Sequence, residues 1–341
     1  MTNLIAKTST EIEDLLQPLV DHGYRGRQVA NWVHQRGAQE FDEMDNLPKS
    51  LRAALEREFS LREPEILEIC ESGDGSAKFL LRFEDGVTVE SVSMPEGAKA
   101  TFCLSSQAGC AVGCTFCVTG AMGSGRNLSA CEIVGQYRRL RRALGEETER
   151  VNIVFMGMGE PLLNTIHLEQ ALSVLYERVS PKRITVSTVG IIPGIEWLAA
   201  LARRPKLAVS LNAPDQERRE AIMPITRKYP LEELIRTIRN FPLERGRRIT
   251  FEYVLIKDFN DAVSDASAVA KLIHGVPSKV NVIPLNEDAD HFPELHQPSA
   301  ETVDAFARTL RDLGHVVTVR WSKGADVAAA CGQLKGRQPA R

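Results

Sequence analysis

The sequence predicts an α/β fold, a partial (βα)6 TIM-like barrel that follows a small helical domain. From about residue 100 onward, six short apolar strand patterns alternate with helical patterns. This alternation is typical of a parallel sheet with right-handed crossovers. Six such units in roughly 220 residues suit a barrel-like or open βα arrangement better than a compact doubly wound sheet. A Rossmann-type sheet is the alternative.

Residues 1–62 are predicted to form a helical accessory domain. Apolar residues recur there with the 3.6-residue period of an amphipathic helix, in three groups. The groups are Ile12, Leu15, Leu16 and Leu19; then Val29, Trp32 and Val33; and, after a turn at 46–48, Leu51, Leu55 and Phe59. We expect the aromatic side chains of Tyr24 and Trp32 in the core of this unit.

Residues 63–97 are predicted to form a short strand-rich connector. Apolar and polar residues alternate in KFLLRF and VTVESVSM, and turn signals lie at 73–75 and 85–86. Strict alternation of this kind indicates half-buried β-strands.

Residues 98–341 are predicted to form the barrel together with a C-terminal segment. The expected strands are 101–106, 151–157, 183–188, 206–211, 248–256 and 279–284, with a further candidate at 315–321. In a βα barrel the loops that follow the strands gather at one face. We therefore expect the motifs after these strands to share one mouth.

The composition is that of a soluble globular protein, with 43% hydrophobic and 26% charged residues. No apolar run approaches the roughly 18 to 20 residues that a bilayer-spanning helix needs. The first residues lack the features of a secretory signal, so we expect a cytoplasmic location. In that reducing compartment, clustered cysteines indicate metal or redox chemistry more than disulfides.

The net charge of -3 argues at first against a nucleic-acid partner, but the charge is unevenly distributed. Residues 1–100 carry a net of -8, and the remainder carries +5. The basic excess includes runs at 138–142, 203–204 and 245–248. RNA or another anionic partner is allowed by this asymmetry but not demanded, and each run alone also fits a solvated helix face.

Cys110-x3-Cys114-x2-Cys117 follows the first barrel strand. Three thiolates on a short loop can hold three irons of a [4Fe–4S] cluster and leave the fourth iron open to another ligand. Structural zinc is the alternative, but such zinc normally takes four ligands. Cys103 could be the fourth, although it lies in the predicted strand, and no histidine lies between Phe41 and Asn164.

A second motif, GMGEP at 157–161, follows the second barrel strand. As a dinucleotide fingerprint it is weak, because Leu162 stands where the third glycine belongs. The carboxylate of Glu160 is suited to accept a hydrogen bond from an ammonium group. The alternative is a charge placed at a helix N-terminus, where the dipole favours it.

The cysteine loop resembles the CxxxCxxC signature of the radical S-adenosylmethionine (SAM) superfamily, which implies a radical SAM barrel. Further segments resemble the RlmN/Cfr family of radical SAM RNA adenine methyltransferases, and most of all its RlmN members. These segments are CLSSQAGCAVGCTFCVTGAMGSGRNLSACEIVGQ, FMGMGEPLLN, VSTVG, SLNAPD and VAAACGQL. The resemblance extends from about residue 22 to Gly336.

The resemblance implies an activity: methylation of adenine C2 in 23S rRNA, and also in tRNA, by a monomer whose helical domain is a possible RNA contact. It implies a [4Fe–4S] cluster on Cys110, Cys114 and Cys117, two SAM molecules per turnover, an external electron donor and a reductant. SAM would chelate the open iron through its amino and carboxylate groups.

The resemblance also implies roles for three residues outside the cluster. Cys331 would carry the methyl group and form a covalent adduct with the RNA, and Cys103 would resolve the adduct by disulfide formation. Glu90 would be the proton acceptor, although residue preferences alone make it an exposed strand glutamate. Cys70 and Cys131 have no family role, and we expect buried structural thiols.

The residues that would surround SAM, by the same match, are Gly159, Glu160, Ser187, Ser210, Leu211, Asn212 and Asn286. The chain departs from the family pattern at Asn212, where a histidine is usual, at Ala325, and in the loop LNEDADHF. These departures leave two alternatives open. One is a Cfr-like methyltransferase acting on adenine C8 or on another RNA, and the other is a non-catalytic iron–sulfur or zinc protein that binds RNA.

Overall fold

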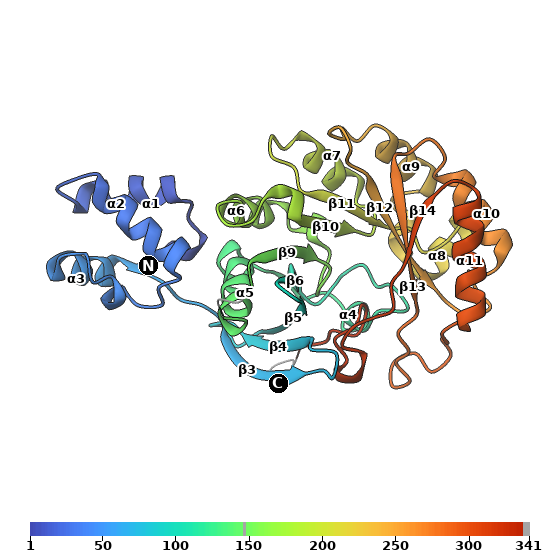
Figure 1. Ribbon diagram of the computed structural model, residues 1–341, viewed down its shortest axis with the longest axis horizontal. Helices are drawn as coiled ribbons and strands as arrows, with labels where there is room; N and C mark the ends of the chain where they lie inside the picture. The colour runs from blue at the N-terminus through green and yellow to red at the C-terminus, as the bar shows by residue number, and fades with distance from the viewer. Residues whose placement is uncertain (146–147, 337–341) are drawn as a thin grey trace.

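The computed structural model describes residues 1–145 and 148–336. A ten-stranded mixed sheet forms the centre, in the order β14-β13-β12-β11-β10-β9-β6-β5-β4-β3. Figure 1 shows helices along the outer side of this sheet and a small helical unit at one end. The strands are β3 (Glu65–Glu71), β4 (Ala77–Arg82), β5 (Thr88–Glu96), β6 (Lys99–Cys103), β9 (Arg150–Phe155), β10 (Ile184–Thr188), β11 (Lys206–Ser210), β12 (Ile249–Leu255), β13 (Ser278–Pro284) and β14 (Val316–Val319).

Within this sheet, β6 and the strands from β9 to β14 are parallel to one another and follow each other in sequence order. A doubly wound Rossmann sheet would reverse its strand order at a switch point, and this sheet has no reversal. The predicted α/β partial barrel is therefore confirmed. The first strand ends at Cys103, three residues earlier than the sequence pattern suggested.

The barrel helices are amphipathic, and their ends carry the expected caps. α9 buries Leu231, Leu234 and Ile238 against the sheet, with glutamates in its first turn and arginines in its last. This arrangement suits both the hydrophobic stripe and the helix dipole. The helices are α4 (Val118–Ala121), α5 (Ala130–Ala143), α6 (Thr165–Leu175), α7 (Ile192–Ala200), α8 (Gln216–Ile222), α9 (Leu231–Arg239), α10 (Val263–Leu272) and α11 (Ala300–Asp312).

Strands β3 to β5 extend the barrel sheet instead of merely linking two domains. β5 pairs antiparallel with β6, and Val92 lies opposite Cys103 in that pair. The C-terminal segment lies near these strands and α4 (Figure 1). Lys78 on β4 donates to the carbonyl of Ala328 at 3.2 Å, and the amide of Val118 donates to the carbonyl of Gly332 at 2.8 Å. Two further strand pairs are short: β1 (Thr2–Asn3) with β2 (Phe59–Ser60), and β7 (Gln107–Ala108) with β8 (Arg126–Asn127).

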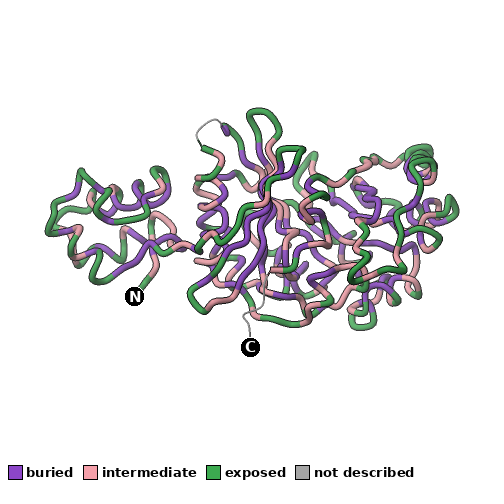
Figure 2. The backbone as a smooth tube through the Cα atoms, turned by 90° about the horizontal axis from the view of Figure 1, so that it is seen from below, coloured by how far each residue is buried: buried purple, intermediate pink, exposed green. Residues whose placement is uncertain are grey.

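The N-terminal unit consists of α1 (Ser9–Leu16), α2 (Tyr24–Asn31) and α3 (Lys49–Glu58), with its own hydrophobic core. Figure 2 shows buried positions on these helices, and they are separate from the buried strands of the barrel. Trp32 is buried as expected, and its Nε1 donates to Asn46 at 2.7 Å. The expectation for Tyr24 was wrong, because its ring is 42% exposed and stacks on His22.

The basic run at 138–142 holds the two parts of the protein together. Arg138 is buried, pairs with Glu63, and donates to the carbonyls of Val33 and Ala38 in the helical unit. Arg142 pairs with the same Glu63 at 2.7 Å. For Arg138, the predictions of a solvated helix face and of an RNA-binding surface are therefore both wrong, because its guanidinium is fully engaged inside the protein.

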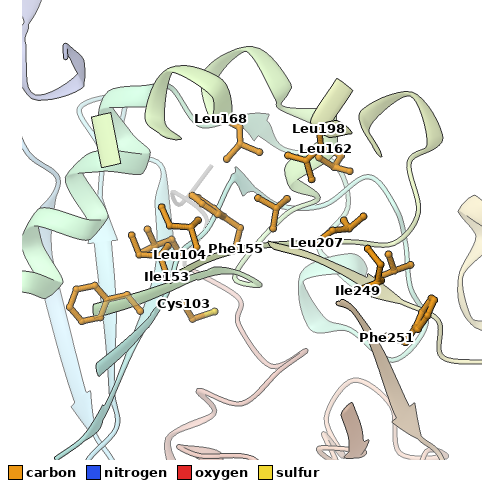
Figure 3. Close-up of a cluster of buried hydrophobic side chains, with 14 of the residues drawn as sticks. Cys103, Leu104, Ile153, Phe155, Leu162, Leu168, Leu198, Leu207, Ile249 and Phe251 are labelled. Carbon is orange, nitrogen blue, oxygen red and sulfur yellow. The ribbon is translucent and has the colours of Figure 1, made fainter. Parts of the chain in front are cut away.

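The main core lies between the sheet and its helices. Figure 3 shows Ile153 and Phe155 of β9, Leu207 of β11 and Phe251 of β12 among these buried side chains, with Cys103 beside them. Among residues 1–145 and 148–336, no helix is long and apolar enough to cross a bilayer.

Candidate functional site

The loops after the parallel strands surround one cavity, here called the cofactor cavity. It brings together most of the site residues that the sequence predicted, although they come from six different strands and loops. Its wall includes Cys110, Cys114, Cys117, Gly159, Glu160, Ser187, Ser210, Asn212, Asn286 and Cys331. Leu211, Cys103 and Glu90 do not line it.

The cysteine loop owes its shape to glycines. Gly109 has a φ of 96°, and a Cβ atom there would come within 2.7 Å of the Gly123 carbonyl. The amide of Cys110 donates to that carbonyl at 2.8 Å, and the amide of Thr115 donates to Ile222 at 3.0 Å. The loop is thereby held between α4 and α8.

The three thiols fit an iron–sulfur cluster better than a zinc ion. Burial raises the pKa of Cys110 to about 11, and it also raises the pKa values of Cys114 and Cys117. Buried thiolates are stable only beside compensating positive charge, which metal binding supplies. A structural zinc ion normally takes four ligands, and Cys103, the fourth candidate, does not line this cavity. In a cluster, by contrast, each of three cysteines binds its own iron.

Glu160 is buried at the edge of the cofactor cavity, and both of its carboxylate oxygens accept hydrogen bonds. The amide of Leu162 donates at 3.0 Å and the amide of Val189 donates at 2.8 Å. The first of these contacts caps a short 3-10 helix (Pro161–Leu163), so the helix-terminus interpretation is also correct in part. Burial raises the pKa of Glu160 to about 7, against the effect of these backbone hydrogen bonds.

Asn212 has a structural role in the loop after β11. Its φ is 56°, a left-handed conformation that Asn adopts more readily than most residues. Its Oδ1 accepts from the amide of Val254 at 3.0 Å, and its own carbonyl accepts from Asn260 at 2.7 Å. The side-chain amide is therefore engaged within the protein.

Arg219 was not predicted from the sequence, and it is completely buried beside the cofactor cavity. Its guanidinium donates to four oxygens: the carbonyls of Leu211 at 3.1 Å, Val189 at 2.5 Å and Ser210 at 3.0 Å, and the hydroxyl of Thr226 at 2.7 Å. Burial lowers the pKa of Arg219 to about 10, and the nearby Cys114 opposes this shift. One cation thus joins the loops after β10 and β11.

A second cavity of about 380 Å³, here called the substrate cavity, lies next to the first. Cys331, Met156, Ile283 and Arg320 line both cavities, whereas Cys103 lines only the second. Its wall is predominantly apolar, and its volume falls within the range of small-molecule pockets. Cys331 thus lies on the wall between Cys110, Cys114 and Cys117 on one side and Cys103 on the other.

The two remaining thiols of this site differ in exposure. Cys103 is buried, and burial raises its pKa to about 12, with the negative charge of a Cys331 thiolate adding to the effect. Cys331 is an exposed residue, yet its sulfur faces the enclosing walls of the cavities, which raise its pKa. Both are free thiols.

Glu90 is buried, contrary to what residue preferences suggest. It pairs with Lys78 at 3.1 Å and accepts from the amide of Lys335 at 2.8 Å. These contacts attach the C-terminal segment to β4 and β5. Glu90 lines neither the cofactor cavity nor the substrate cavity.

A second carboxylate in the cofactor cavity was also missed. Glu252 lies within β12, where its Oε1 accepts from Asn281 at 3.0 Å. Its Oε2 is buried without a hydrogen-bond partner in the described residues, and burial raises its pKa. A glutamate inside the apolar strand ITFEYVL was the available signal.

The two cysteines without a predicted role lie elsewhere. Cys70 is half-buried on the edge strand β3, so the expectation of a buried thiol was wrong. Cys131 is also only partly buried, although it packs against both hydrophobic cores and burial raises its pKa to about 11.

Comparison with known proteins agrees with this geometry. Residues 104–267 match the radical SAM superfamily, and residues 2–61 match the N-terminal domain of ribosomal RNA large subunit methyltransferases. The chain is 43% identical to a probable dual-specificity RNA methyltransferase RlmN of Thermus thermophilus, with 96% of this chain and 93% of the relative covered. It is 44% identical to the dual-specificity RNA methyltransferase RlmN of Geobacter sulfurreducens, with 99% and 94% covered.

A solved structure is similar over the same length. The crystal structure of a radical SAM methyltransferase from Sphaerobacter thermophilus has a TM-score of 0.92 and 40% identity, and the match covers 98% of this chain and 99% of that one. Membership of the radical SAM superfamily implies a [4Fe–4S] cluster and SAM as cofactors. Because the relatives match almost from end to end, the chain belongs to the RlmN family of radical SAM RNA methyltransferases.

Proposed function

We propose that this chain methylates C2 of an adenine in 23S rRNA and in tRNA, with Cys331 as the methyl carrier. The position of Cys331 between two cavities supports this proposal most directly. The cofactor cavity contains the predicted cluster cysteines, and the substrate cavity contains Cys103 in a mostly apolar wall. One thiol can therefore face the cofactor on one side and an extruded base on the other.

On the cofactor side, Cys110, Cys114 and Cys117 would hold the cluster, and the loops after the strands would bind SAM. The proposed SAM-binding residues are Gly159, Glu160, Ser187, Ser210, Leu211, Asn212 and Asn286. Glu160 suits an ammonium group, because charge-assisted hydrogen bonds are the strong ones. When bound, the cluster supplies the electron that cleaves SAM into methionine and a 5′-deoxyadenosyl radical.

Leu211 and Asn212 would act by holding the loop at the cofactor cavity. The amide of Leu211 donates to the carbonyl of Glu252 at 2.9 Å, and the carbonyl of Asn212 accepts from Asn260 at 2.7 Å. The carbonyl of Leu211 is bound by Arg219, and the side chain of Asn212 is bound to Val254. Asn212, at the position where a histidine is usual, thus holds this loop through its side chain and its left-handed backbone.

On the substrate side, Cys331 would accept a methyl group from a first SAM, with loss of its thiol proton and release of S-adenosylhomocysteine. The S-methyl group would then give one hydrogen atom to the 5′-deoxyadenosyl radical, and its carbon would bond to C2 of the adenine. Loss of one electron, to an acceptor that the cluster would supply, and loss of the C2 proton would leave a closed-shell covalent enzyme–RNA adduct. The Cys103 sulfur, after loss of its proton, would attack the Cys331 sulfur. The carbon–sulfur bond would break, a disulfide would form, and the departing carbon would take up a proton to become the methyl group on the adenine. An external reductant would restore both thiols.

Glu90 is the proposed proton acceptor for the adenine proton. It contacts the amide of Lys335, in the same C-terminal segment that carries Cys331. Because Glu90 lies outside both cavities, this role requires the C-terminal segment to shift when RNA binds.

The test uses the full chain, reconstituted anaerobically and incubated with SAM, a reductant, and 23S rRNA or tRNA. Mass spectrometry of the digested RNA should find 2-methyladenosine. Finding 8-methyladenosine instead would establish the Cfr-like alternative, and a protein that neither assembles a four-iron cluster nor cleaves SAM would be non-catalytic.

Three variants test the roles of the cysteines. Cys331→Ala should carry no methyl group, whereas Cys103→Ala should become methylated and remain covalently attached to RNA. Cys70→Ala is the matched control, because that thiol lies on the edge strand β3, and it should behave as wild type. Identical, adduct-free behaviour of the first two variants would contradict the assignment.

A further inference from the structure

An exposed tryptophan stands at the rim of the substrate cavity. Trp321 is 53% exposed and lines this cavity together with Cys103 and Cys331. Within the described part of the chain, its indole has no hydrogen bond, ring contact or cation partner. By contrast, the Nε1 atoms of Trp32 and Trp197 each have a hydrogen-bond acceptor, Asn46 and Glu169.

The loop that carries this indole is firmly held. The amide of Gly324 donates to Asp74 at 2.9 Å, and the hydroxyl of Ser72 donates to Asp326 at 2.6 Å. Gly324 has a φ of 67°, which allows the tight turn just after Trp321. Because the turn between β3 and β4 already fixes this loop, a ligand that meets the indole has little loop entropy to remove.

Two basic residues lie close to Trp321 in the sequence, and the charge of one of them, Arg320, also acts on Glu252 in the cofactor cavity. Arg320 precedes Trp321 and lines both cavities, and Lys323 follows it at the rim of the substrate cavity. In the part of the chain that the structure describes, neither side chain forms an ion pair. An exposed aromatic ring at a basic rim suits single-stranded nucleic acid, since the ring can stack on a base while a cation such as Lys323 attracts a phosphate.

We propose that Trp321 stacks on the nucleotide next to the target adenine and that Lys323 binds the adjoining phosphate. The inference rests on the proposed function, because only an RNA substrate places a neighbouring nucleotide at this rim. The target base must leave its stack to enter the substrate cavity, and its neighbour then loses a stacking partner. The indole replaces that partner and so holds the extruded conformation.

The test measures RNA binding and methylation by the full-length, cluster-loaded protein with tRNA. Trp321→Ala should weaken RNA binding and raise KM by about 10-fold, in keeping with the loss of one base–aromatic stack. Trp321→Phe keeps a ring and should stay within about 3-fold of wild type. In both variants, SAM cleavage without RNA should be unchanged, because Trp321 does not line the cofactor cavity.

Intrinsic fluorescence gives a second measurement. RNA should quench the emission of wild type and of the control Trp197→Phe, and this quenching should be lost in Trp321→Phe. If Trp321→Ala binds and methylates tRNA as wild type does, the platform is rejected while the proposed function stands. If wild type methylates no RNA, the proposed function itself fails. A change of emission on dilution of the protein without RNA would mean that a second copy covers the indole, and would also overturn the inference.

Discussion

Arg219 is the residue whose replacement tests most directly how the cofactor cavity is built. Arg219→Met keeps most of the side-chain volume but removes four hydrogen bonds, to the carbonyls of Leu211, Val189 and Ser210 and to Thr226. At about 1.5 kcal/mol for each hydrogen bond to a charged donor, the loss is about 6 kcal/mol.

Removal of the charge offsets part of that loss. The lowering of the pKa from 12.5 to about 10 corresponds to about 3 kcal/mol that the folded protein loses by holding the cation inside. We therefore expect the free energy of unfolding to fall by about 3 kcal/mol. Both folded and unfolded states keep this guanidinium charged below pH 10, so the difference should not depend on pH between 6 and 9.

Urea unfolding of the cluster-free protein measures this difference without any contribution from the cofactor. Arg218→Met is the matched control on the same helix, since Arg218 is partly exposed and pairs with Asp215 and Asp265. Loss of those pairs should cost about 1 kcal/mol or less. Equal unfolding midpoints for wild type and Arg219→Met, or equal losses in the two variants, would refute the reasoning. In the cluster-loaded protein, Arg219→Met should also weaken SAM binding, because the loops after β10 and β11 lose their common donor.

Three further predictions concern the loops, the domain contact and pH. Asn212→Ala should lower the free energy of unfolding by about 2 kcal/mol, through the left-handed backbone and the unpaired amide of Val254; Asn212→Gly, which relieves the backbone alone, should lose about half as much. Arg138→Met should lower the free energy of unfolding by about 3 kcal/mol, because it breaks a buried ion pair. It should also expose the segment after residue 62 to limited proteolysis, whereas the control Arg141→Met should not. Equal cleavage of both variants would contradict the role of Arg138 in the domain contact. The pKa of Glu160 is raised to about 7 in the folded protein. Its contribution to the free energy of unfolding of the cluster-free protein should therefore be greatest below about pH 4.5. About 3 kcal/mol of that free energy should be lost as the pH rises to about 7. Glu160→Gln should remove that part of the pH dependence in urea titrations. An unchanged profile would contradict the assignment of this pH dependence to Glu160.

Local sequence patterns predicted much of the fold. Strand positions from β9 to β13 agree with the sequence patterns to within two residues, because apolar periodicity reports directly which side chains face a core. The cysteine loop was equally clear, since the ligand spacing of a cluster lies within eight consecutive residues. The resemblance to RlmN proteins was confirmed by relatives that match nearly the whole chain.

The residues that sequence patterns missed are polar groups buried by distant elements. Glu90 looks like a surface glutamate until the C-terminal segment covers it, and Arg138 looks like a helix-surface arginine until the helical unit packs on it. Whether a charged side chain is buried depends on contacts between residues that are 100 or more positions apart. Such contacts leave no periodic trace in the sequence.

By itself, the sequence determined the order of strands and helices and the loop of three cysteines, because backbone periodicity and short ligand spacing are local properties. Only the tertiary structure showed which cavity each of the remaining thiols of the site lines. It places Cys331 on a wall between two cavities and Cys103 in the second of them. It also showed that Arg219 donates hydrogen bonds to the loops after β10 and β11, and that Trp321 is exposed at the rim of the substrate cavity. The physical reason is that a cavity forms only where separate strands converge, and the chain reaches that arrangement through packing of the whole sheet.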